Sequence, residues 1–86
     1  MLPKNIILPN FSSVIKTVKN NALIAVYKHP KDFPDSFVAR LFISRYPTRY
    51  CVVRKTYDEL FSIKPKGMCV VPRDDDDDPV IVESWL

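Results

Sequence analysis

The sequence is poor in the residues on which many catalytic and cofactor-binding motifs depend. Among its 86 residues are one glycine, Gly67, and one histidine, His29. A single glycine excludes the glycine-rich loops that bind phosphates and dinucleotides, because each of those loops needs several glycines close together. A lone histidine in a proline-rich stretch is more often a solvated side chain than a catalytic base. We therefore expect no catalytic residues, no cofactor and no enzymatic activity.

Cysteine is scarce as well, with only Cys51 and Cys69. Both lie among valines in segments that we expect to be strands, and an apolar environment raises the pKa of a thiol and lowers its reactivity. Free buried thiols are the usual state in a reducing compartment, whereas disulfides belong mainly to secreted proteins. A disulfide between neighbouring strands is the alternative. We expect two structural thiols.

Long apolar runs and a secretion signal are also missing. The longest apolar run, residues 22–27, has the length of a strand and falls far short of the roughly 18 residues that a membrane span needs. The first residues include Lys4 but no apolar segment followed by a small-residue cleavage site, so we expect no signal peptide. The sequence thus favours a cytoplasmic protein with no membrane partner.

Proline, in contrast, is abundant, and most of its eight occurrences lie between apolar runs, where they mark loops. The runs between these loops have the length and composition of strands. We expect strands over residues 22–28, 37–43, 50–54, 68–71 and 80–86. Strands joined in succession by loops favour an α+β fold built on a mostly antiparallel sheet of four or five strands.

Two segments have features of helices. Thr56 is followed three residues later by Glu59, the spacing of a capping box, which predicts a short helix over about residues 56–64. Phe11, Val14 or Ile15, and Val18 have the spacing of one apolar helix face, which predicts a second helix over about residues 11–20. We expect an N-terminal arm or helix, residues 1–21, followed by a single domain, residues 22–86.

The expected strands have more apolar surface than one short helix can cover. We expect Arg40 to point to solvent, which places Ala39 and Leu41 on the opposite, buried face of the strand. Phe42 then lies on the same face as Arg40. In the last strand, Ile81 and Trp85 share a face with Glu83. Either the N-terminal segment packs on this second face, or a partner protein or a second copy does. Phe42, Ile81 and Trp85 are therefore the candidates for a protein interface.

Charge is segregated along the chain, although the net charge is only +3. All 13 Lys and Arg residues lie within residues 1–73 with four acidic residues, whereas residues 74–86 contain six acidic residues and no basic one. Such asymmetry indicates an interaction role. Basic and aromatic residues alternate around the third expected strand, a composition that suits phosphate contacts and base stacking. The nucleic-acid candidates are Arg45, Tyr46, Arg49, Tyr50, Arg54 and Lys55.

The run Asp74–Asp78 is the most conspicuous acidic feature. Its carboxylates suggest calcium or magnesium, but consecutive aspartates lack the alternating ligand spacing of an EF-hand loop, and no glycine supplies the tight turn. Mimicry of a phosphate backbone is a further alternative, with a small footprint. We expect a solvated loop that protects a sheet edge, and no metal site.

The runs VYKHPKDFPDSFVARLF and DDPVIVESWL resemble small proteins encoded by phages and prophages of Gram-positive bacteria. The resemblance covers residues 22–86 and implies a compact cytoplasmic protein from a mobile element, with no activity and no site residues to transfer. The leading hypothesis from the sequence is a non-enzymatic binding or modulator protein that acts through protein contacts, including self-association. The alternative is a nucleic-acid-binding protein that uses the basic and aromatic residues above.

Overall fold

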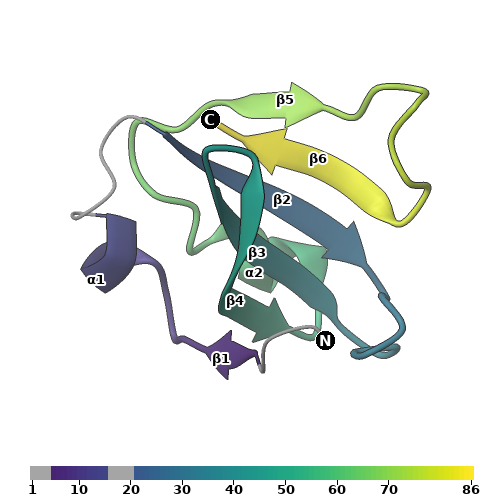
Figure 1. Ribbon diagram of the computed structural model, residues 1–86. Coiled ribbons are helices and arrows are strands. Elements are labelled where there is room, and N and C mark those ends of the chain that lie inside the picture. Colours follow the sequence, from purple (N-terminus) through teal and green to yellow (C-terminus); the bar gives the residue numbers. More distant parts are fainter. Residues whose placement is uncertain (1–4, 16–20) are drawn as a thin grey trace.

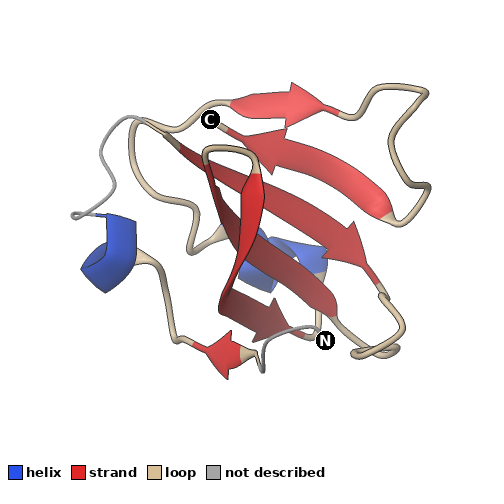
Figure 2. Ribbon diagram, viewed as in Figure 1, coloured by secondary structure: helices blue, strands red, loops and turns tan. Residues whose placement is uncertain are grey.

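Six strands form one mixed sheet in the computed structural model, which describes residues 5–15 and 21–86 (Figures 1 and 2). The order across the sheet is β1-β4-β3-β2-β6-β5, and β1 is the one strand that pairs in parallel. The expected α+β fold with a mostly antiparallel sheet is thus confirmed. The elements are β1 (Ile6–Ile7), α1 (Ser12–Ile15), β2 (Ala22–Lys28), β3 (Phe37–Ile43), β4 (Tyr46–Arg54), α2 (Tyr57–Phe61), β5 (Val70–Pro72) and β6 (Ile81–Trp85).

The sheet has one strand more than expected, and β4 is longer. β1 was missed because it has two residues, too few for a pattern, and it pairs with Tyr50 and Cys51 of β4. β4 begins at Tyr46, because β3 and β4 are joined by a two-residue turn in which Ser44 and Arg45 have φ of 51° and 72°. Positive φ at both central residues is the type I′ geometry that suits a hairpin.

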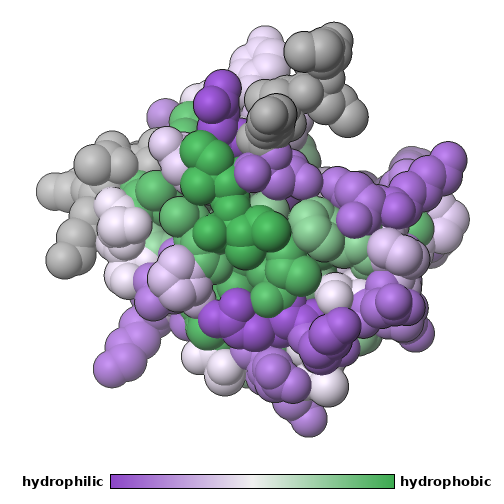
Figure 3. All heavy atoms as spheres, turned by 90° about the horizontal axis from the view of Figure 1, so that it is seen from below, coloured by the Kyte–Doolittle hydropathy of each residue, from purple (hydrophilic) through white to green (hydrophobic). Residues whose placement is uncertain are grey.

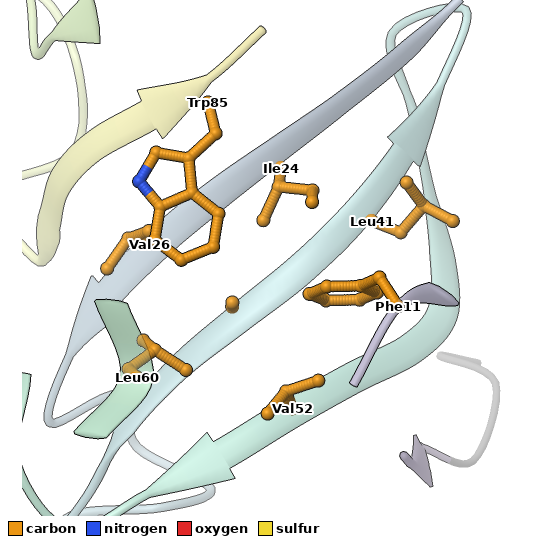
Figure 4. Packing of buried hydrophobic residues seen from close by; sticks show 8 residues of the cluster. Phe11, Ile24, Val26, Leu41, Val52, Leu60 and Trp85 are labelled. Atoms are coloured by element: carbon orange, nitrogen blue, oxygen red, sulfur yellow. The ribbon is translucent and has the colours of Figure 1, made fainter. Parts of the chain in front are cut away.

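The hydrophobic core lies between the sheet and the segments that contain the two helices (Figure 4). Phe11, which directly precedes α1, and Leu60 of α2 are both fully buried against the same face of the sheet. Phe11 of the N-terminal segment therefore packs into the core beside α2. Trp85 is fully buried in this core opposite Ile24 of β2, so its expected position on an uncovered face is wrong.

The helix α2 is shorter than expected. The Thr56 hydroxyl accepts from the Glu59 backbone N–H at 3.1 Å, which confirms that half of the capping box, and it donates to the Glu59 carboxylate at 3.2 Å. The regular helix ends at Phe61, after which Ile63 and Lys64 bond to carbonyls three residues back. At α1, the Asn10 side chain accepts from the Ser12 N–H at 3.0 Å. The expected continuation over residues 16–20 lies outside the described residues.

None of the helices in the described part of the chain has the length and hydrophobicity that crossing a bilayer requires.

Candidate binding groove

The face of the sheet opposite the helices holds a second set of buried side chains. Arg40 of β3 lies on this face, with Ala25 of β2 opposite it on one side and Cys51 of β4 on the other. Ala25 and Cys51 are buried, as is Val38, two residues before Arg40 on the same face. No described helix packs here, so segments flanking the sheet cover these residues.

A groove of about 290 Å³ opens on this second face. Its floor consists of Val38 and Arg40 from β3 and Tyr27 from β2. Three segments far apart in the sequence form its rim, namely the residue before β1, the loop after β2 and the start of β4. These rim residues are Asn5, Pro30, Asp32, Pro47 and Thr48. We call this feature the Arg40 groove.

The guanidinium of Arg40 is fixed by two hydrogen bonds. Its Nη1 donates to the carbonyl oxygen of Thr48 at 2.9 Å, and its Nη2 donates to Oδ1 of Asn5 at 2.7 Å. The Asn5 amide in turn donates from Nδ2 to Oδ2 of Asp32 at 3.2 Å. Because arginine has five N–H donors, three of them have no acceptor within the described residues. The groove thus contains a guanidinium that is fixed in place and has three N–H groups available to a ligand.

Tyr27 adds a neutral donor to the groove floor. Burial raises the pKa of its hydroxyl, Arg40 lowers it, and Asp78 and Asp32 raise it to a smaller extent. Since the net direction is upward from 10.0, the hydroxyl is protonated at neutral pH. The described residues provide no hydrogen-bond partner for it, so it is free to bond with a ligand.

The two cysteines lie in different environments, and both are free. Cys51 is fully buried below the groove face, and burial raises the pKa of its thiol, an effect that Arg40 partly opposes. Cys69 is exposed, so its expected burial is wrong. The reason is its position just before β5, at the edge of the sheet, where only β6 is a neighbour.

The three predicted interface residues do not form one surface. Trp85 belongs to the core, as described above. A register shift in the pairing of β2 with β6 places Ile81 opposite Tyr27, away from the face of Glu83 and Trp85. Phe42 is half-buried on the Arg40 side of β3. The structure therefore brings Phe42 and Ile81 to the groove face and leaves Trp85 on the other.

The six nucleic-acid candidates are spread along the length of β4. Arg45, Tyr46 and Arg49 are exposed together at the tip of the β3–β4 hairpin, where Tyr46 is 75% exposed. Tyr50 packs against the core. Arg54 donates to the Pro9 carbonyl oxygen at 2.6 Å, which holds the N-terminal segment in place.

Lys55 is exposed at the opposite end of β4 from Arg45. Ten residues of extended strand separate them by roughly 30 Å. Three of the six candidates are therefore exposed near one end of β4.

The acidic run forms its own turn. Asp74 N–H donates to Oδ2 of Asp77 at 2.9 Å, and Val80 N–H donates to Oδ1 of Asp78 at 3.1 Å. Within residues 5–15 and 21–86, no three metal-ligating side chains converge on one point. Two of the five carboxylates thus serve the loop's own backbone.

Apolar side chains are exposed at both edges of the sheet. Figure 3 shows the molecule from below, the side on which β1 lies in Figure 1, and apolar side chains gather in the middle of this face within a hydrophilic surround. Ile6 and Ile7 of β1 are 38% and 56% exposed. At the other edge, Val70 and Val71 of β5 are also exposed. Pro72 ends β5, and a proline at a sheet edge discourages pairing with another strand.

Comparison of the chain with known proteins found no matching family model, no matching curated protein and no matching solved structure.

The sequence did not identify the residues of the Arg40 groove as a site. One signal was present, since Arg40 is a charged residue within the apolar run FVARLFI, and a charge on a largely buried strand needs polar partners. The partners themselves, Asn5 and Thr48, lie 35 and 8 residues away in the chain. No local spacing connects them.

Proposed function

We propose that this chain is a non-enzymatic binding protein that acts through contacts with another protein, and that the Arg40 groove receives part of that partner. The observation that carries the proposal is a guanidinium with three spare N–H donors at the floor of an open groove. Binding sites typically combine apolar walls with a few fixed polar groups. Val38 on the floor and Pro30 and Pro47 on the rim supply such apolar surface around Arg40.

The state of the nucleophilic groups supports a non-enzymatic role. The Cys51 thiol is fully buried and its pKa is raised by burial, so little thiolate is present at neutral pH. The ring of His29 packs edge-on against Phe37, with 5.3 Å between the ring centroids. Neither group is placed as an activated nucleophile or a base in the Arg40 groove.

The test is capture of partners with three forms of the purified protein in nuclease-treated lysate. We expect the wild-type protein to retain a specific protein, Arg40→Gln to lose it, and Arg49→Gln to keep it. Arg49 is an exposed arginine of the neighbouring strand and serves as the matched control. Equal retention by all three forms would contradict the assignment of the groove.

The exposed cluster of Arg45, Tyr46 and Arg49 supports a second candidate function, the binding of single-stranded nucleic acid. Cations supply affinity for phosphates, and an exposed tyrosine supplies a stacking surface. For single strands, log K is expected to fall with log salt by about 0.7 per phosphate neutralised. Arg45→Glu with Arg49→Glu should abolish binding to an oligonucleotide, whereas Arg40→Gln should leave it unchanged. Unchanged binding in the double variant would exclude the hairpin tip.

We further propose that the chain belongs with the phage and prophage proteins that it resembles and works in the reducing cytoplasm. The exposed free thiol of Cys69 supports this location, because reducing conditions keep such a thiol free. Mass spectrometry of protein isolated from its host under acid quench should show both thiols reduced. A Cys51–Cys69 disulfide would contradict the proposal.

A further inference from the structure

The Arg40 groove presents a cation and a carboxylate at a defined separation. Arg40 and Asp32 are joined through the side-chain amide of Asn5, with 2.7 Å from the guanidinium to Oδ1 and 3.2 Å from Nδ2 to the carboxylate. One planar amide therefore spans the two charges. The N–Cα–C unit of an amino acid, which has a donor nitrogen at one end and a carboxylate at the other, has a similar span.

The remaining surface of the groove is apolar and small. Val38, Pro30, Pro47 and the ring of Tyr27 provide hydrocarbon surface around the polar groups. A volume of about 290 Å³ lies just below the usual range for ligand pockets, which begins at about 300 Å³. The groove thus suits a ligand of about one amino-acid residue with an apolar side chain.

We propose that the Arg40 groove binds the α-carboxylate of an amino-acid residue that has an apolar side chain. This chemistry occurs in a free amino acid and in the C-terminal residue of a protein. Arg40 binds the carboxylate through its spare N–H donors, and Asp32 accepts from the α-nitrogen. The inference rests on the proposed function only in that both use this groove.

A carboxylate fits these groups better than a phosphate does. Arginine and carboxylate form paired, charge-assisted hydrogen bonds. A phosphate dianion would bring two negative charges close to Asp32 against the single positive charge of Arg40, and like charges at short range repel. Because the α-nitrogen donates a hydrogen bond to Asp32, the carboxylate of Asp32 attracts an amino-acid ligand, whereas it repels a phosphate.

The experiment is a titration of the ¹⁵N-labelled full chain followed by NMR. The probes are N-acetyl-L-leucine, N-acetyl-L-leucinamide and free L-leucine, together with a pentapeptide ending in leucine as the free acid and as the amide. We expect N-acetyl-L-leucine to shift amide signals of groove residues with a Kd of roughly 0.1–1 mM, given its size. The uncharged leucinamide should bind at least tenfold more weakly.

Variants assign the contacts. Arg40→Gln should abolish binding, and Arg40→Lys, which keeps the charge but loses the planar fork, should restore part of it. Asp32→Asn should weaken the binding of free leucine more than the binding of N-acetyl-L-leucine, because only the free amino acid has an ammonium group. Asp35→Asn changes an exposed carboxylate in the same loop; it is the matched control and should bind as the wild type does. If Arg40→Gln does not fold, the comparison of N-acetyl-L-leucine with N-acetyl-L-leucinamide on the wild-type protein still tests whether the groove binds a carboxylate.

Either source of the carboxylate supports the inference, and the probes distinguish them. Tighter binding of the peptide acid than of free leucine identifies a protein C-terminus, and the reverse identifies a free amino acid. Equal affinity of acid and amide, or shifts confined to residues outside the groove, would overturn the inference. An Arg40-dependent protein partner with no response to any carboxylate would overturn this inference alone. Binding of free leucine without a captured partner would contradict the proposed function and leave this inference standing.

Discussion

The carboxylate of Glu83 is a buried polar group on which two donors depend. Glu83 is 7% exposed, and it accepts from the Tyr57 hydroxyl at 2.9 Å and from Nε1 of Trp85 at 2.7 Å. The bond from Tyr57 connects α2 to β6, and the bond from Trp85 lies within β6. We consider the substitution Glu83→Leu, which keeps a similar side-chain size and removes both acceptors.

The expected loss of stability follows from the two orphaned donors. A hydrogen bond to a charged group contributes about 1.5–3 kcal/mol, and a buried donor without a partner costs about 1–3 kcal/mol. The Trp85 N–H is fully buried, whereas half-buried Tyr57 is able to turn its hydroxyl towards water. Removing a buried charge also relieves its desolvation cost, which offsets part of the loss. We therefore expect Glu83→Leu to lower the free energy of unfolding by about 3 kcal/mol.

Urea unfolding monitored by far-UV circular dichroism measures this loss in two backgrounds. In the wild type the full loss is expected. In the Tyr57→Phe/Trp85→Phe background no donor remains to be orphaned, so Glu83→Leu should cost about 0–1 kcal/mol there. Glu83→Gln, which retains one acceptor oxygen, is the control with an intermediate cost. An equal cost of Glu83→Leu in both backgrounds would refute the hydrogen-bond argument and attribute the effect to shape alone.

Three further changes have outcomes that the structure defines. Ser44→Asn with Arg45→Gly should raise stability by about 1 kcal/mol in urea unfolding, because both positions have positive φ, and Arg45→Ala, which keeps a Cβ, should show no gain. Burial and the bond to Glu83 raise the pKa of Tyr57 from 10.0 to about 12, so its stabilisation is present below pH 10 and is lost as the pH rises through 12. The stability difference between wild type and Tyr57→Phe should shrink over that range, and a constant difference would contradict the argument. A thiol reagent should modify exposed Cys69 in the folded protein and buried Cys51 only on unfolding, as followed by mass spectrometry; equal rates would refute the assignment.

The elements with local signals were predictable from the sequence. Both β2 and β3 have the bounds that the apolar runs between proline-rich loops indicated, because these strands begin and end at turn residues. The N-cap of α2 was predictable because Thr56 and Glu59 are three residues apart. Side-chain alternation also placed Ala39 and Leu41 correctly in the core.

Features that depend on pairing between distant strands were not predictable. The Ser44–Arg45 turn lacks the glycine or asparagine that identifies a type I′ turn, so the start of β4 was placed four residues too late. The register shift between β2 and β6 separates Ile81 from Trp85, although alternation within β6 alone places them on one face. A bulge is a property of two strands, and a single-strand pattern does not contain it.

The Arg40 groove and the N-terminal segment are structurally coupled, because Asn5 of the segment contacts Arg40 of the groove. The segment is held to β4 by the bond from Leu8 N–H to the Cys51 carbonyl oxygen at 2.8 Å and by the bond from Arg54 to Pro9. Phe11 of this segment packs in the core on one face of the sheet, and Asn5 of the same segment contacts Arg40 on the opposite face. The carboxylate ligand proposed above, bound to the spare N–H donors of Arg40, would share the guanidinium with Asn5. The proposed occupancy of the groove and the attachment of the N-terminal segment therefore depend on one guanidinium, so we expect ligand binding to change the stability of that attachment.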